Sequence, residues 1–290
     1  MARTGPYGLD AEVLARSARG DGRHQVLRLI QGGRPVVLKL YGRKRDRLRD
    51  WLRDLGHRLL AGKSGMSPPA RLRTERAALE LWRRHGFRVP DVLDVALPSE
   101  VPSLRLVLEW IDGCRMKEML ADPAVPLDAK RRLLGRCAHE WGRRHELALQ
   151  LAEPALLHAH ASFAHVLVAG EEPVSIDFEV AWRRRDVERL VSLELAGFFD
   201  SLARCAPPPQ VDALLDAVVA AYPARERLAR VAADARGGPY RAFTWLARAA
   251  RRLTARGRAI GATLGRLDSA LARAASTESR GAFRGTKSHP

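Results

Sequence analysis

The sequence of 290 residues predicts an α+β protein with a small, strand-rich N-terminal region and a helical C-terminal region. Short apolar runs bounded by glycine or proline, together with one main helix, fill residues 1–111, whereas helical periodicity dominates residues 112–275. The chain is long enough to form two lobes of this kind. The polar tail, residues 276–290, is expected to be disordered.

The N-terminal region begins with two predicted strands, Leu14–Ala18 and Gln25–Ile30. Gly20 and Gly22 lie between them. Backbone N–H groups of such a turn can face phosphates, although most glycine-containing turns between strands are plain hairpins.

Val36–Tyr41 is mostly apolar, as expected of a buried central strand, and its one charge is Lys39. A lone lysine in an apolar strand either meets an anion or faces water at an edge. The predicted helix Ala70–His85 carries Glu75 and Glu80, either of which could pair with Lys39. The alternative is that these glutamates lie on a solvated helix face.

The net charge of +17 is concentrated in two segments: residues 42–88 hold 14 basic and 5 acidic residues, and residues 236–290 hold 12 and 2. The first segment predicts a basic amphipathic helix within Gly42–Gly65, with Trp51 on its apolar side, and the second predicts Arg-rich helices over Tyr240–Leu271. Such surfaces suit nucleic acid, anionic lipid or a phosphorylated glycolipid. Solvated helix faces, or packing of the first helix on the small lobe, explain the same residues.

The sequence also bears on location. No apolar run reaches the length of a membrane span, and the first ten residues carry no export signal. Cys114, Cys137 and Cys205 are scattered and fit reduced thiols better than disulfides or a zinc site. We expect a cytoplasmic protein, peripheral at the inner membrane if its basic helices bind lipid.

The lobe boundary is expected near Asp112, directly after the predicted strand Leu104–Ile111. Helical periodicity then predicts a long helix over Leu127–Leu147 and shorter helices over Val211–Tyr222 and Ala224–Ala235.

The stretch His158–Trp182 lies at the centre of the prediction. It reads as a loop with three histidines, a short strand, a tight turn and a second strand that ends at Asp177. A carboxylate at a strand end, opposite a histidine-bearing loop, is a typical arrangement for holding a metal ion against a phosphate.

These landmarks in this order resemble a bilobal protein-kinase-like fold. They are the Lys39 strand, the Glu75 helix, the Glu109 hinge, the His158 loop and the Asp177 strand end. Two details are similar to the lipopolysaccharide kinase family, whose members phosphorylate heptose or Kdo sugars of the lipopolysaccharide core. His165 stands where most kinases have a metal-binding asparagine, and Ile176-Asp177-Phe178-Glu179 continues into an Arg-rich segment.

The resemblance implies ATP and Mg²⁺ as cofactors and a sugar hydroxyl of a glycolipid as acceptor. Lys39, with Glu75 orienting it, would contact the ATP phosphates, and Gly20, Gly22 and Glu109 would complete the nucleotide site. Asp177 would bind Mg²⁺, His165 would take the second metal or phosphate position, and His158 would anchor the loop. His160 stands where these kinases have the aspartate that accepts the substrate proton, a step that a neutral imidazole can also perform.

Other readings stay open. His160 in place of aspartate, with Ala159 where arginine is common, also fits a pseudokinase that binds or scaffolds. His158, His160 and His165 could instead share a metal in a hydrolase, although His139 and His145 are explained by helix packing. A role with nucleic acid would depend on charge alone, and we expect no specific nucleic-acid partner.

Overall fold

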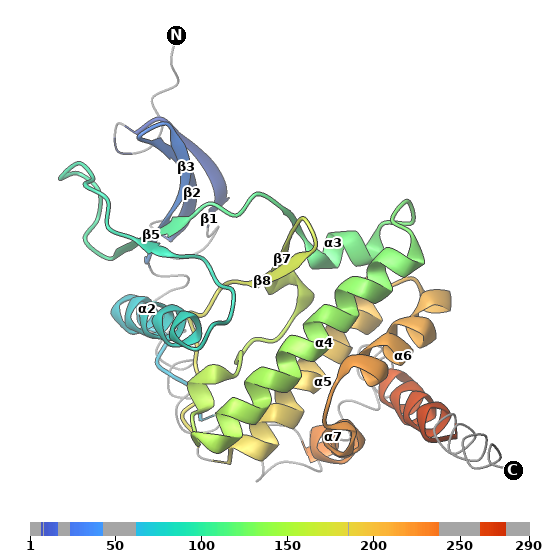
Figure 1. The fold of residues 1–290 in the computed structure, drawn as a ribbon. Helices are drawn as coiled ribbons and strands as arrows, with labels where there is room; N and C mark the ends of the chain where they lie inside the picture. Colours follow the sequence, from blue (N-terminus) through green and yellow to red (C-terminus); the bar gives the residue numbers. More distant parts are fainter. Residues whose placement is uncertain are drawn as a thin grey trace, which may run out of the picture. The chain divides into compact units, whose positions relative to one another are not determined.

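The computed structural model describes residues 7, 9–16, 24–42, 62–184, 186–237 and 262–276 (Figure 1). The chain divides into two compact units. The first comprises Met1–Gly113, Pro154–His160 and Val174–Arg185, and the second Cys114–Glu153, Ala161–Pro173 and Asp186–Pro290. Strands forming an antiparallel sheet dominate the early part of the chain and helices the later part, so the predicted α+β fold class is confirmed.

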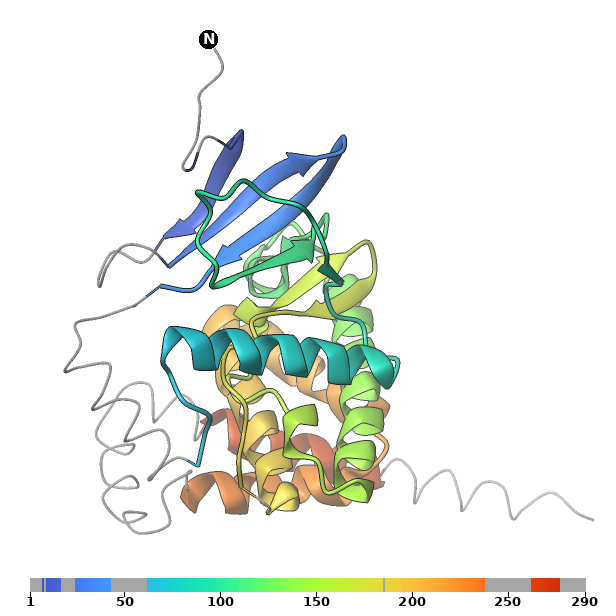
Figure 2. The ribbon, with the colours of Figure 1, turned by 90° about the vertical axis from the view of Figure 1, so that its left-hand side faces the viewer.

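The first unit is built on a five-stranded antiparallel sheet in the order β1-β2-β3-β5-β4, with β1, β2 and β3 side by side in blue in Figure 2. The strands are β1 (Ala11–Arg16), β2 (Gln25–Gln31), β3 (Arg34–Leu40), β4 (Val92–Leu93) and β5 (Arg105–Glu109). β4 is the shortest strand of this sheet, because only Val92 and Leu93 pair with β5.

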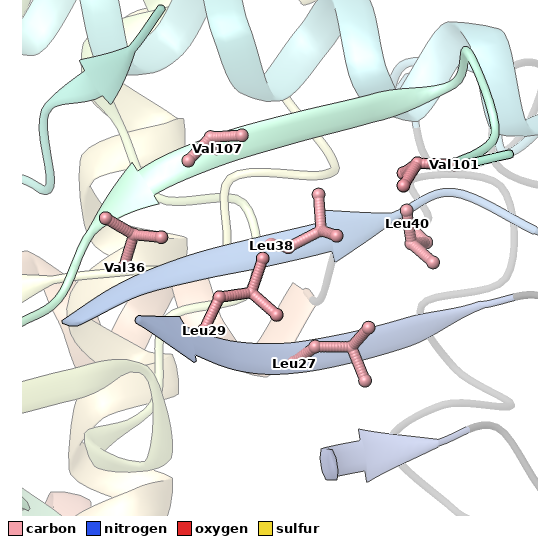
Figure 3. Packing of buried hydrophobic residues seen from close by; sticks show 7 residues of the cluster. All are labelled: Leu27, Leu29, Val36, Leu38, Leu40, Val101 and Val107. Atoms are coloured by element: carbon pink, nitrogen blue, oxygen red, sulfur yellow. The ribbon is translucent and has the colours of Figure 1, made fainter. Parts of the chain in front are cut away.

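A hydrophobic cluster lies on one face of this sheet. Its buried members come from β2, β3, β5 and the loop before β5: Leu27, Leu29, Val36, Leu38, Leu40, Val101 and Val107 (Figure 3). Successive side chains of a strand point to opposite faces. Lys39, between Leu38 and Leu40, is therefore directed to the other face of β3, away from this cluster.

Helix α2 (Pro68–Arg84) begins with proline in its first turn and is followed by Gly86 in the left-handed conformation, with φ of 74°. Its buried residues recur every three or four positions and form one face: Arg71, Glu75, Ala78, Leu79 and Trp82. An arginine and a glutamate on a buried face each need a partner of opposite charge.

Trp82 explains why the first unit takes in two segments that the prediction placed in the C-terminal region. Its ring lies edge-on to Phe178, with ring centroids 4.6 Å apart, and to His158 at 6.4 Å. Its indole N–H also donates to the carbonyl of Ala155 at 2.9 Å. Residues 154–160 and 174–185 are thereby packed onto α2.

The second unit is mainly helical. Its elements are β6 (Cys114–Arg115), α3 (Met116–Ala121), α4 (Leu127–Gln150), η4 (Phe163–His165), β7 (Val166–Ala169), α5 (Val187–Cys205), α6 (Val211–Ala221) and α7 (Arg225–Gly237), with a further helix over residues 262–276. β7 and β8 (Glu172–Ser175) form a hairpin that β6 extends to three strands. Trp141 of α4 stacks on Phe198 of α5, with ring centroids 4.4 Å apart.

Several predicted features lie outside the described residues. They are Gly20 and Gly22, residues 43–61 of the basic amphipathic segment, residues 240–261 of the Arg-rich helices, and the tail after residue 276. Among the residues that the structure describes, no helix is long and apolar enough to cross a membrane.

Candidate active site

Lys39 is buried, and its ammonium group donates to both carboxylate oxygens of Glu75, at 2.9 and 2.7 Å. The predicted pairing of Lys39 with a glutamate of this helix is thus confirmed, and Glu75 is the partner. Glu80, the alternative partner, is exposed on the same helix. Lys39 also donates to the carboxylate of Asp177 at 2.9 Å.

Three carboxylates surround the ammonium group of Lys39. Burial by itself lowers the pKa of Lys39, but Asp177, Glu75 and Glu179 outweigh burial and raise that pKa well above its ordinary value. Lys39 is therefore charged at any physiological pH. Glu75 also accepts a hydrogen bond from the hydroxyl of Tyr41 at 2.6 Å, so both of its oxygens are engaged.

Asp177 follows β8 with a φ of 66°, in the left-handed region that few residues other than glycine adopt. Such backbone conformations cost free energy and cluster at functional sites. Its side chain is 34% exposed, whereas those of Lys39 and Glu75 are 9% and 2% exposed. Asp177 is consequently the carboxylate of this group that a ligand can reach from solvent.

Glu179 is a buried member of the site that the sequence reasoning missed. One of its oxygens lies 3.1 Å from the ammonium of Lys39, and the other accepts from Arg71 at 3.0 Å. Arg71 is itself buried and also donates to the carbonyls of Met66 and Gly42. The available signal was a charged residue between Phe178 and Val180, where the kinase motif has glycine.

The donor set of this site fits a divalent cation. Carboxylate oxygens of Glu75, Asp177 and Glu179 all lie within 4.8 Å of one another, and such hard oxygen ligands suit Mg²⁺. These three carboxylates carry one more negative charge than the two cations beside them, Lys39 and Arg71, carry positive charge. That excess is reachable at Asp177, so the residues present agree with the metal role that the sequence predicts for it.

His158 connects the loop to the Asp177 strand end. Its Nε2–H donates to the carbonyl of Ile176 at 2.9 Å, and its Nδ1 accepts from the backbone N–H of His160 at 3.2 Å. Both ring nitrogens are therefore used by the backbone, as expected of a loop anchor. The same contacts argue against a metal shared by His158, His160 and His165, because His158 has no lone pair left for it.

The structure places the remaining predicted site residues as follows. His160 is half-buried at the end of the first unit's loop segment, and its role as proton acceptor stays a prediction. His165 is half-buried at the end of η4 in the second unit, where the N–H of Phe163 donates to Ser201 of α5 at 3.0 Å. Its role as a metal ligand stays a prediction as well.

Glu109 is committed to contacts inside the first unit. Its carboxylate accepts from both terminal nitrogens of Arg88, at 2.8 and 2.6 Å, and these bonds lower its pKa. Its backbone N–H donates to the carbonyl of Asp91 at 2.8 Å. A backbone contact of Glu109 with a nucleotide, which the resemblance implies, would therefore have to use its carbonyl rather than its N–H.

The class of protein follows from the fold and these contacts. A lysine on β3, paired with a glutamate of α2 and facing an aspartate after a β-hairpin, is the arrangement of a protein-kinase-like fold.

Comparison with known proteins gives a distant likeness. No protein-family model matches the chain, and none of the curated proteins matches it. Among solved structures, the chain is similar to the one titled "WaaP in complex with acyl carrier protein", with 16% sequence identity over 84% of this chain and 89% of that chain and a TM-score of 0.45. A likeness at this level does not assign a family, an activity or a partner to the chain.

Proposed function

We propose that the chain is an ATP- and Mg²⁺-dependent phosphotransferase that acts on a sugar hydroxyl of the lipopolysaccharide core or a related glycolipid. The observation that carries the proposal is the buried group of Lys39, Glu75 and Asp177, with its accessible carboxylate at Asp177. The acceptor class comes from the resemblance of His165 and the Asp177 motif to lipopolysaccharide kinases.

Each residue has a part in this reaction. Lys39 would bind nucleotide phosphates as a cation, and Glu75 would hold its ammonium in place. Asp177, with Glu179 close by, would hold Mg²⁺, which when bound neutralises charge on the phosphates. His160 would accept the proton of the sugar hydroxyl, and His158 would hold the loop that carries it.

Location belongs to the same proposal. A glycolipid acceptor places the reaction at the inner face of the cytoplasmic membrane, and the two basic segments at 42–88 and 236–290 have the charge to bind that anionic surface.

Calorimetric titration of ATP, with and without Mg²⁺, tests the nucleotide site. The wild type is expected to bind ATP more tightly with Mg²⁺, and Asp177→Ala and the isosteric Asp177→Asn should lose that gain, at least about tenfold in Kd. Asp128→Asn is the matched control, because Asp128 is an exposed carboxylate of the second unit paired with Arg131. It should bind as the wild type does.

The outcomes separate the possible functions. No ATP binding by the folded wild type under any condition would overturn the proposal. Mg²⁺-dependent binding together with transfer of the γ-phosphoryl group to purified lipopolysaccharide core would support it in full. Binding without any transfer would favour the pseudokinase alternative, in which His160 does not replace the catalytic aspartate.

A further inference from the structure

The peptide group between Ala159 and His160 is held at both ends. Its carbonyl oxygen accepts from the ammonium of Lys63 at 2.6 Å, and its N–H donates to Nδ1 of His158 at 3.2 Å. This peptide immediately precedes the proposed proton acceptor, so these two bonds fix the backbone from which the His160 side chain projects.

Lys63 comes from a segment that is itself attached to the residues after Asp177. The N–H of Ser64 donates to the carbonyl of Ala181 and the N–H of Arg183 to the carbonyl of Gly62, both at 2.8 Å. The N–H of Ala181 in turn donates to the hydroxyl of Ser64 at 3.0 Å. Residues 62–64 and 181–183 therefore form a short antiparallel pairing, centred on the bridge between Lys63 and Trp182.

Two further features hold Lys63 in position. Its ammonium lies 4.3 Å from the ring centroid of Trp182, a cation–π contact with a ring that is only 7% exposed. Gly62 has a φ of 61°, and a Cβ there would lie 2.4 Å from the side chain of Arg184. A side chain at this position would adopt a strained backbone conformation and would displace the side chain of Arg184.

We propose that Lys63, which lies outside the loop of His158 and His160, is a positioning residue for His160. The proposal rests on the phosphotransferase function, since it assigns Lys63 to that same site. Ala159 stands where kinase loops commonly carry arginine, so this loop has no cation of its own at that position. A hydrogen bond from an ammonium is stronger than one from a neutral donor, and Lys63 brings such a donor to the Ala159 carbonyl.

Lys63→Met tests this directly, because it keeps much of the side-chain length and removes the donor and the charge. We expect kcat for phosphoryl transfer from ATP, to purified lipopolysaccharide core or to water, to fall about 10- to 100-fold, as for other losses of alignment. The Kd of Mg²⁺-ATP and the binding stoichiometry should stay within about twofold, because Lys39 and Asp177 are untouched. Lys63→Arg keeps a charged donor and should recover kcat to within about threefold of the wild type.

The control is Lys117→Met, the same change at a half-buried lysine on α3 of the second unit, which should leave kcat unchanged. Equal kcat for Lys63→Met and the wild type would overturn the proposal. So would loss of kcat in both the Met and Arg variants, because the side chain would then matter for packing rather than as a charged donor.

A second measurement keeps the proposal testable if the wild type does not bind ATP and the phosphotransferase function fails. Amide hydrogen exchange at His160 reports on the Ala159–His160 peptide group without any nucleotide, because the N–H of His160 makes one of the two hydrogen bonds that hold this peptide. Faster exchange at His160 in Lys63→Met than in the wild type would support the positioning contact. Equal rates would overturn it, whatever the function of the chain.

Discussion

Glu194 of α5 is the centre of a buried polar network in the second unit, and its neutralisation provides a sharp test of the structure. It accepts from the two terminal nitrogens of Arg144 at 3.1 and 2.8 Å and from Nε2–H of His145 at 3.2 Å. The side chains of Arg144, His145 and Glu194 are 1%, 0% and 0% exposed. Nδ1 of His145 accepts from the hydroxyl of Tyr222, so the network joins α4 and α5 to the end of α6.

Glu194→Gln keeps the shape of the side chain and removes the carboxylate charge that accepts both hydrogen bonds from the buried Arg144 guanidinium. Burial by itself raises the pKa of Glu194, but Arg144 and His145 outweigh burial and lower that pKa from 4.5 to about 2. This difference corresponds to about 3 kcal/mol in favour of the ionised carboxylate. Removal of one partner of a buried ion pair typically costs about 3–5 kcal/mol, which is of the same order.

Native-state hydrogen exchange of α4 and α5 amides at neutral pH, supported by urea unfolding followed by circular dichroism, measures this loss. We expect the free energy of unfolding of the second unit to fall by about 3 kcal/mol in Glu194→Gln. Glu171→Gln is the control, because Glu171 forms an exposed pair with Arg136 and should cost less than about 1 kcal/mol. A cost below about 1 kcal/mol for Glu194→Gln as well would refute the buried network as described.

Two further predictions concern pH and lipid. In the folded state, burial lowers the pKa of His145, and its charged partners lower the pKa of Glu194. As the pH falls, the unfolded chain therefore takes up these protons before the folded chain does, and stability is lost. The urea concentration at the unfolding midpoint should fall below about pH 6.5 through His145, and again from about pH 4.5 toward pH 2 through Glu194. A midpoint independent of pH between 8 and 3 would contradict this sign. The intact protein should float with anionic vesicles at low salt and be released at high salt, and absence of binding at low salt would refute the proposed membrane contact.

Strand and helix periodicity predict those parts of the fold that depend on residues close together in the sequence. The isolated charge of Lys39 in an apolar strand and the glutamates of the helix Ala70–His85 made a pairing possible, and the resemblance to kinases favoured Glu75, which the structure confirms as the partner. Trp82 likewise lies at helical spacing from Ala78 and Leu79 on the buried face of α2. Such features depend on strand and helix periodicity, which can be read from a single sequence.

The missed residues are those whose partners lie far away in the sequence. Glu179 meets Arg71 across 108 positions, and Lys63 meets the Ala159 carbonyl across 96. Neither contact follows from periodicity, because Arg71 and Lys63 each lie in a basic stretch in which most charges were expected to face solvent or a polyanion. Only the tertiary pairing distinguishes them from their exposed neighbours.

In the proposed nucleotide site, the contacts of Lys39 predict that ATP binding depends on the metal. In the structure described here, its ammonium already contacts Asp177 as well as Glu75 and Glu179. A phosphate that takes the place of the Asp177 carboxylate on this ammonium would remove a cation from a partly exposed carboxylate. That state is unfavourable unless another cation takes the place of Lys39. ATP alone should therefore bind weakly, and a divalent cation should strengthen its binding through Asp177.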